Sequence, residues 1–567
     1  GFVEAGLGSK GRREVSAAVS TPLIPGKLAA RLSFASDAYD GFYDNPVPGG
    51  PKIGSEKSQA GAITLRATPT DRLEAVLRVS YAEDDDGQWK GFYLQTNCRQ
   101  RLTNGVPTGA FTQYCGEIPE SGPTLAANPE HFGFVRDAWR SSATVTYDLS
   151  FATVTSITAV NAETNEFNRD NDYGPLRLSQ AGQLSDRWDA SQELHLVGAD
   201  RGQAVTWLIG ASAYRFDNET ERRNIEFWSG QTTTTGLPRT DERTDSTALY
   251  GSVGWRLRPD VTLTGDLRWQ RDWKDFRTTS TDRTGRPITA ADAWTLWTPR
   301  LTADWRMTER VMLYASAAKG VKSGGFNTMA NIFPEERSFG PETNWTYEAG
   351  AKTAWFDGRL VANAALFWVD WTDQQVVAAS AAGTNNNFYT NNAARSRSRG
   401  VEIDLTAAPA DGVGLRLAYT FADAEFRDYQ DPDYVTITGF APTGDVSGLA
   451  LPRQSRHQIA AGLDLDGDVA AVAGLGWFAG AEWLWQSRQY TENTNLSWIP
   501  ADGKVNLRAG VETGGLRLTV RVQNLFDDRT PPVAVRFSEP TAAGYRRAWL
   551  VTPGDGRTWS VQARWSF

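Results

Sequence analysis

Apolar and polar residues alternate with a period of two along much of the chain. In the last ten residues, 558–567, five apolar side chains fall on one face of an extended strand and five polar side chains on the other. The apolar face consists of Trp559, Val561, Ala563, Trp565 and Phe567. A face this apolar needs an apolar medium, and in lipid no backbone group is left unpaired. We therefore expect this strand to pair on both edges and to close a barrel with the start of the chain.

The same alternation recurs upstream, most clearly at 73–81, 261–269, 401–406, 413–421 and 516–523. Together with the turn residues between them, these segments predict an all-β fold with 22 antiparallel strands. The predicted strands are residues 2–9, 12–21, 28–36, 59–68, 73–84, 140–149, 153–169, 191–197, 204–216, 245–257, 261–273, 297–307, 311–319, 344–355, 360–376, 399–408, 413–427, 457–465, 476–487, 504–512, 516–525 and 558–567.

The connections between these segments alternate in length. Short turns rich in Pro, Gly and Asp, such as 69–72 and 409–412, alternate with long polar stretches. The predicted long loops are residues 37–58, 85–138, 171–190, 217–244, 274–296, 321–343, 377–398, 428–456, 488–503 and 527–557. This layout is typical of a transmembrane barrel with short periplasmic turns and long extracellular loops. A soluble propeller is disfavoured because no repeat of 40–50 residues is visible.

The polar face of the predicted strands decides between a membrane barrel and a soluble one. It carries ionic side chains such as Glu74, Asp266, Glu402 and Arg517. Unpaired ions in a dry core would each cost several kcal/mol, so this face must meet water or a polar plug. About 22 strands enclose a wide lumen. The opposite face must then meet lipid.

Composition narrows the function further. The net charge of −9 argues against a nucleic-acid partner. There is no run of about 18 apolar residues, so no transmembrane helix is expected. No P-loop, nucleophile elbow, HExxH or Rossmann fingerprint occurs, so we expect neither an enzyme nor a cofactor. No metal site is predicted, because the three histidines are far apart in the sequence.

Two cysteines, Cys98 and Cys115, lie in one polar stretch rich in Gly and Pro. We expect them to form a disulfide that cross-links this loop, which implies an oxidising compartment. The alternative is two free thiols. The CxxC spacing of a metal site is absent.

Several fragments, in order along the chain, resemble the barrel of TonB-dependent outer-membrane receptors, in particular the large iron-siderophore branch. They are G-F-Y-D-N at 41–45, A-K-G-V-K-S-G-G-F-N at 318–327, N-W-T-Y-E-A-G-A-K at 344–352, D-G-R-L and F-W-V-D-W-T-D-Q-Q within 357–375, R-G-V-E-I-D-L at 399–405, V-Q-N-L-F-D at 522–527 and the terminal aromatic strand. The resemblance covers nearly the whole chain and implies localisation in the outer membrane of a Gram-negative bacterium.

The front of the chain departs from the family pattern. Members carry a globular plug and a short box that binds TonB ahead of the barrel, whereas residues 1–9 already resemble a first barrel strand. We therefore interpret residues 1–567 as the barrel alone, with plug and box missing from this chain. Either the sequence is truncated or the barrel is plug-less, and a plug-less barrel would be a passive porin.

The resemblance places ligand binding at the outward-facing mouth, where loop aromatics are plentiful. Rings there are suited to stacking on a flat chelate, and cations to attracting an anionic one. The candidate ligand-binding residues are Tyr93, Trp139, Tyr173, Trp228, Lys322, Phe326, Asn327, Phe388, Tyr389, Tyr490 and Trp498. For the aromatic residues, loop packing or contact with the membrane interface is the competing interpretation, and for Lys322 it is a solvated loop or contact with lipopolysaccharide.

The function implied by the resemblance is active import of a scarce ligand, with a ferric siderophore as the first choice. Carbohydrate, cobalamin or another chelate are the alternative ligands. The expected partners are TonB, through the missing N-terminal segment, and the lipid and lipopolysaccharide of the outer membrane. No nucleic acid is expected.

Overall fold

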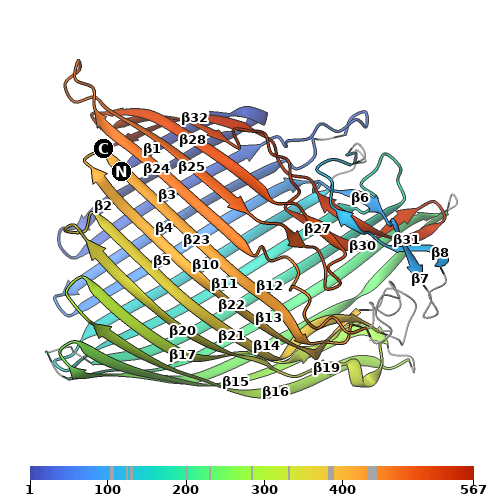
Figure 1. Ribbon diagram of the computed structural model, residues 1–567, viewed down its shortest axis with the longest axis horizontal. Helices are drawn as coiled ribbons and strands as arrows, with labels where there is room; N and C mark the ends of the chain where they lie inside the picture. The colour runs from blue at the N-terminus through green and yellow to red at the C-terminus, as the bar shows by residue number, and fades with distance from the viewer. Residues whose placement is uncertain are drawn as a thin grey trace.

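The computed structural model describes residues 1–50, 52–101, 107–122, 125–127, 132–198, 202, 204–228, 231–281, 285–329, 332–380, 388–431 and 444–567. Within these residues, 22 strands form one closed antiparallel barrel in which each strand pairs with its neighbours along the chain. Both termini lie at one end of the barrel, and the longer connections gather at the other end, here called the mouth (Figure 1). The described residues contain no helix long and apolar enough to cross a bilayer.

The barrel strands of the first half are β1 (Phe2–Gly8), β2 (Arg13–Ile24), β3 (Leu28–Tyr39), β4 (Glu56–Thr70), β5 (Leu73–Gly87), β10 (Gly133–Asp148), β11 (Ala152–Asp170), β12 (Ser179–Gly198), β13 (Val205–Trp228), β14 (Gln231–Arg258) and β15 (Val261–Thr281). Those of the second half are β16 (Pro287–Arg306), β17 (Val311–Lys322), β20 (Glu342–Trp355), β21 (Leu360–Ala379), β22 (Phe388–Ala410), β23 (Val413–Asp428), β24 (His457–Asp468), β25 (Gly476–Gln486), β28 (Asp502–Thr513), β29 (Leu516–Gln523) and β32 (Thr558–Ser566). Each of the 22 predicted spans falls on one of these strands.

The first and last strands close the barrel, as the terminal alternation predicted. β1 pairs with β32 over seven residues, from Phe2 opposite Ser566 to Gly8 opposite Ser560. At the very ends, the amino group of Gly1 donates to the carbonyl of Phe567, and the amide of Phe567 donates to the carbonyl of Gly1 at 3.0 Å. No backbone edge is left open at this seam, which is the condition for a strand surrounded by lipid.

Hydrogen bonds that skip a strand identify the concave face of the wall. Gln562 of β32 donates to Glu14 of β2 at 2.5 Å, across Gly6 of the strand between them. A Cβ at Gly6 would lie 2.9 Å from the Gln562 side chain. Tyr250 of β14 reaches Glu193 of β12 in the same way, at 2.6 Å. Side chains two strands apart converge only on the concave side, so the polar face lines the bore.

The apolar face is therefore convex and points outward. Leu516, Val520 and Val561 are 39%, 50% and 43% exposed there. Arg517, which alternates with them, lies on the bore side within reach of Glu512 at 3.4 Å. The facing predicted from the sequence is confirmed, and it is the arrangement that a lipid bilayer around the barrel requires.

The wall is much taller on one side than on the other. β13 and β14 contain 24 and 28 residues, whereas β1 contains seven. On the short side a single 3-10 turn, η1 (Ser9–Gly11), joins β1 to β2. The taller strands run to the mouth as the lower green and cyan arrows in Figure 1.

The prediction that 171–190, 217–244 and 274–296 are loops is wrong for most of their length. These segments are polar on both faces, which the sequence analysis took as the end of the wall. In the structure they continue as paired strands, and β13 pairs with β14 out to Trp228 opposite Gln231, with one shift of register between Thr220 and Arg222. Arg243 and Asp245 pair at 2.6 Å on the outward face. Ion pairs here replace the apolar surface that lipid demands nearer the termini.

Ten shorter strands among the described residues build small sheets at the mouth. They are β6 (Phe92–Gln95), β7 (Cys98–Arg101), β8 (Pro107–Gln113), β9 (Gly116–Glu117), β18 (Gly325–Phe326), β19 (Ser338–Phe339), β26 (Gln489–Tyr490), β27 (Ser497–Ile499), β30 (Val533–Thr541) and β31 (Gly544–Thr552). β6 pairs with β31, and β9 pairs in parallel with β27. These pairings join connections that leave the barrel several strands apart.

Candidate functional site: the loop assembly at the mouth

An apolar core holds the connections together over the short side of the wall. Its members come from the loops after β3, β5, β25 and β29, and Trp549 of β31 is fully buried among them. The core consists of Ile53, Phe92, Ile118, Leu125, Ala127, Ile499, Ala534, Trp549 and Val551. The Trp549 indole N–H donates to the Thr491 hydroxyl at 3.4 Å. The loop assembly is thus a packed unit rather than a set of independent loops.

Two of the predicted ligand contacts, Tyr93 and Tyr173, lie in a neighbouring cluster and are 8% and 7% exposed. Their rings meet edge to face at 5.9 Å. The Tyr93 hydroxyl donates to the carbonyl of Asn171 at 2.7 Å, and burial raises the pKa of Tyr93. Neither ring presents a free face at the mouth, so their placement favours the competing interpretation, loop packing.

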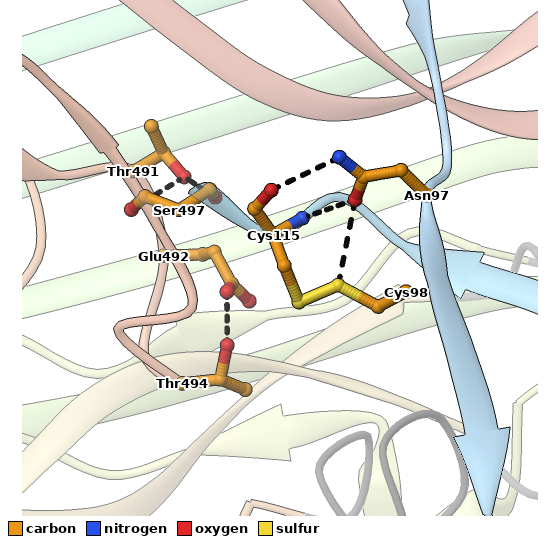
Figure 2. Close-up of a disulfide and its surroundings, with 7 residues drawn as sticks. All are labelled: Asn97, Cys98, Cys115, Thr491, Glu492, Thr494 and Ser497. Atoms are coloured by element: carbon orange, nitrogen blue, oxygen red, sulfur yellow. Dashed lines mark hydrogen bonds between the residues drawn. A yellow bond between two sulfur atoms is a disulfide. The ribbon is translucent and has the colours of Figure 1, made fainter. Parts of the chain in front are cut away.

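The predicted disulfide between Cys98 and Cys115 is present, with 5.7 Å between the two Cα atoms (Figure 2). Asn97 reinforces it, because its side chain accepts from the Cys115 amide at 2.6 Å and donates to the Cys115 carbonyl at 3.0 Å. Cys115 directly precedes β9, whose partner β27 belongs to the β25–β28 connection. The disulfide therefore fixes one loop where it joins another.

Phe326 and Asn327 anchor the segment that follows β17 to the inner wall. The Phe326 ring lies 5.6 Å from those of Phe276 and Trp294. Asn327 is 8% exposed, accepts from the Thr390 amide and donates to the Thr390 carbonyl, both at 2.8 Å. These contacts position the segment itself and use the side-chain amide of Asn327.

Lys322 ends β17 and is exposed. It pairs in register with Glu342 at the mouth end of β20. Nearby, Lys274 of β15 donates to the carbonyl of Gly324 at 2.8 Å. This arc of the mouth therefore carries two ammonium groups beside the aromatic cluster of Phe326.

Trp139 does not belong to the mouth, and its prediction as a ligand contact is corrected. It lies within β10, is 56% exposed and packs on Tyr81 at 4.8 Å. It shares an outward apolar groove with Ile63 and Phe567. Since β10 begins at Gly133, Trp139 has already entered the wall, and the strand alternation directs its ring to the membrane side.

The remaining candidates lie at strand ends or in a small sheet. Trp228 ends β13 and Phe388 begins β22, and the structure describes only their backbone. Tyr389 is partly buried, and its hydroxyl accepts from Asn391 at 3.2 Å. Tyr490 and Trp498 are register partners in the sheet of β26, β27 and β9. Because they are register partners, the side chains of these last two lie on the same face of that sheet.

The structure adds one arginine that sequence reasoning missed. The Arg488 guanidinium lies 5.5 Å from the Tyr490 ring centroid and 5.8 Å from that of Trp498. The signal in the sequence was its position two residues before Tyr490, the spacing that puts two side chains on the same side of an extended segment. The polar run around them hid this pattern.

A buried acid pair was also missed. Asp170 is 1% exposed, and Asp172 accepts backbone amides from Gly174 at 3.1 Å and Leu178 at 2.9 Å. Burial, followed by the negative charge of Asp170, raises the pKa of Asp172 to about 7. This pair shapes the turn between β11 and β12 beside Tyr173. No group of three or more His, Cys, Asp or Glu side chains suited to a metal ion lies within the described part of the chain.

The closed barrel with an apolar convex face and a polar bore defines the chain as a β-barrel membrane protein. Residues 38–525 match the family described as TonB dependent receptor-like, beta-barrel. The chain belongs to this family of receptors and transporters and is an outer-membrane protein.

Similar proteins support the family assignment. The pesticin receptor of Yersinia enterocolitica is 22% identical over 544 residues, which cover 93% of this chain and 71% of the receptor. The metal-pseudopaline receptor CntO of Pseudomonas aeruginosa is 31% identical over 150 residues, 26% of this chain and 18% of CntO. The ferric yersiniabactin uptake receptor FyuA of Yersinia pestis superimposes with a TM-score of 0.80 at 16% identity, covering all of this chain and 80% of FyuA.

Proposed function

We propose that this protein is a receptor that imports a ferric siderophore across the outer membrane, energised by TonB. The observation that carries the proposal is the match of residues 38–525 to the TonB-dependent receptor barrel. The relatives add support, because the names of several solved neighbours specify ferric siderophores: ferric yersiniabactin for FyuA and ferripyoverdine for a Pseudomonas aeruginosa receptor. In this proposal the mouth faces outward, captures the ligand, and passes it into the bore.

The chemistry of the mouth agrees with such a ligand. Aromatic rings and cations lie together at two places, around Phe326 with Lys274 and Lys322, and around Arg488 with Tyr490 and Trp498. Ferric chelates are often anionic and flat, so stacking and charge attraction both favour them. A sugar or a cobalamin would use the rings but would gain little from the charges.

Iron uptake tests the proposal directly. The receptor is expressed in a Gram-negative strain that lacks its own siderophore receptors, under iron limitation. Radioactive iron is supplied as chelates of the catecholate, hydroxamate and carboxylate classes. We expect accumulation of at least one chelate, and loss of that accumulation when tonB is deleted. Uptake that persists without TonB would indicate a passive pore, and uptake of no chelate would refute the proposal.

A further inference from the structure

The small sheet of β26, β27 and β9 has two unlike faces. Ser497 and Ile499 of β27 are 0% and 3% exposed and face the apolar loop core, as does the Thr491 hydroxyl that bonds Ser497. Trp498, between them in sequence, points to the opposite face together with its register partner Tyr490. Figure 2 shows Thr491 and Ser497 meeting beside Cys115. The opposite face is partly exposed.

Arg488 borders this second face, where the chain passes from β25 to β26. β25 directs its even-numbered residues inward, since Gly480 underlies the bond from Arg508 to Asp464. The ladder continues past the end of β25, where the Ser487 amide donates to the His457 carbonyl at 2.9 Å. Arg488 is the next residue and lies between this end of the ladder and the start of β26 at Gln489.

The charge of Arg488 is not neutralised within the described part of the chain. Two other guanidinium groups near the mouth bind carboxylates: Arg136 contacts Asp84, and Arg397 contacts Asp370 at 2.7 Å. Arg488 is exposed, and its contacts are the two ring faces of Tyr490 and Trp498. A cation–π contact orients a guanidinium through its flat face, so the N–H groups at its edge take no hydrogen-bond partner from this contact. The paired N–H donors of the Arg488 guanidinium, here called its fork, are therefore oriented by the rings and available to a ligand.

A carboxylate lies at the other edge of this face and gives the face a positive and a negative end. Glu117 of β9 pairs in register with Trp498 and is exposed, on the edge of the sheet opposite β26. The aromatic pair thus lies between a cation at one edge and an anion at the other. A ligand whose ring stacks on the pair gains most when its negative oxygens point to the β26 edge.

We propose that Arg488, Tyr490 and Trp498 form a binding site for an aromatic ring that bears anionic oxygens, as in a catecholate or phenolate iron chelate. The inference rests on the proposed function and narrows it to an aromatic, anionic ligand. The rings of Tyr490 and Trp498 stack on the ligand ring. The Arg488 fork donates two parallel hydrogen bonds to adjacent oxygens, a geometry that an ammonium group cannot reproduce. An aliphatic hydroxamate offers neither the ring nor the charge.

The test measures binding to outer membranes that contain the receptor, with two probes: ferric tris(2,3-dihydroxybenzoate) and metal-free 2,3-dihydroxybenzoate. We expect Arg488→Gln to weaken binding of both probes about tenfold or more, the effect of losing a hydrogen bond to a charged group. Arg488→Lys should be intermediate, because the charge stays and the fork is lost. Heat-modifiable migration in gels verifies that each variant folds.

Arg453→Gln is the matched control. Arg453 is exposed at the same mouth, and its backbone amide donates to the Tyr490 carbonyl at 2.7 Å. Removing its charge changes the net charge of the mouth by the same one unit but leaves the aromatic pair and Arg488 intact, so binding should change less than about twofold. Equal losses in Arg488→Gln and Arg453→Gln, or no loss in either, would overturn the site.

The two proposals fail in different ways. If the receptor binds dihydroxybenzoate through Arg488 but imports no iron chelate, the proposed site stands and the proposed transport function is refuted. If the wild type and Arg488→Gln import iron equally well and bind both probes with equal affinity, the proposed function stands and the proposed site is refuted.

Discussion

On one side of the barrel, β13 and β14 run for 24 and 28 residues up to the mouth, whereas on the other side β1 stops after seven. The tall side completes its rim with backbone ladders and with outward ion pairs such as Arg243 to Asp245. The short side completes its rim with a buried apolar core centred on Trp549 and with a disulfide. The rim of the mouth is thus stabilised by hydrogen bonds and ion pairs on the tall side and by hydrophobic burial on the short side.

The difference teaches where the mouth is able to change. A ladder of backbone hydrogen bonds opens one pair at a time, so the tall rim frays from its tip. A packed core is lost as a unit when one large member is removed. The platform of Arg488, Tyr490 and Trp498 is built on the short side, on a sheet whose other face belongs to that core. Ligand recognition there is therefore coupled to the integrity of the loop core.

The largest expected effect comes from deleting the centre of that core. Trp549→Ala should cost the loop assembly about 3–5 kcal/mol, the usual loss for a buried tryptophan, and should expose β31 and β6. Trp273→Ala, on the outward face of the tall side and 37% exposed, should cost less than about 1 kcal/mol. Hydrogen exchange of the amides in both regions measures the two costs. Comparable effects of the two substitutions would contradict the contrast between the sides.

The disulfide should contribute next. Cys98 and Cys115 are 17 residues apart, and closing a loop of this size stabilises the folded form by about 3 kcal/mol in the chain-entropy description. Replacing both by Ser should raise proteolysis between them and weaken the pairing of β9 with β27. The tall side should be unaffected, and it serves as the internal reference in the same digest. Unchanged cleavage of the loop would show that Asn97 and the core suffice.

The barrel strands could be predicted from the sequence because their signal is local. Val520 is apolar and faces lipid, whereas Arg517 is charged and faces the bore. This alternation with a period of two is visible in any window of a few residues. The prediction ended the wall too early near Arg243, where both faces are polar. Beyond the membrane, solvent covers both faces, and the alternation that marks a strand disappears while the ladder continues.

The loop core could not be predicted, because its members come from four connections and share no period. Trp549 and Phe92 are more than 400 residues apart in the chain, yet their strands β31 and β6 are paired. Tyr93 and Tyr173 were expected at a ligand because exposed and buried loop tyrosines look alike in sequence. Tyr490 and Trp498 were found as aromatic loop residues, but their pairing, which brings Arg488 onto both rings, depends on the fold.

The acid pair on the edge of the core gives a smaller, pH-dependent effect. The pKa of Asp172 is raised in the folded protein, chiefly by burial and then by Asp170. The folded loop therefore holds a proton that the unfolded loop releases, and its stability falls as pH rises from about 4 to about 7 and is level above that. The loss should reach roughly 2 kcal/mol, because Asp172 is only partly buried and solvent screens part of the cost.

Amide exchange of Leu178, corrected for the intrinsic pH dependence, measures this opening. In Asp172→Asn the side chain stays neutral, so protection should vary little over the same range. The amides of β14 on the tall side provide the reference. A wild-type profile as flat as that of Asp172→Asn would show that the carboxyl is ionised throughout.

The smallest effect is expected from the ion pairs that finish the tall side. Arg243 and Asp245 are both about one-third exposed, so solvent screens their attraction and the pair is worth less than about 1 kcal/mol. A double-mutant cycle with Arg243→Gln and Asp245→Asn isolates the pairwise energy from the effect of each change alone. The coupling should shrink further in high salt, since both groups lie within a Debye length of bulk ions. A salt-independent coupling above about 2 kcal/mol would mean that the tall rim depends on a desolvated ionic core, in the way that the short rim depends on Trp549.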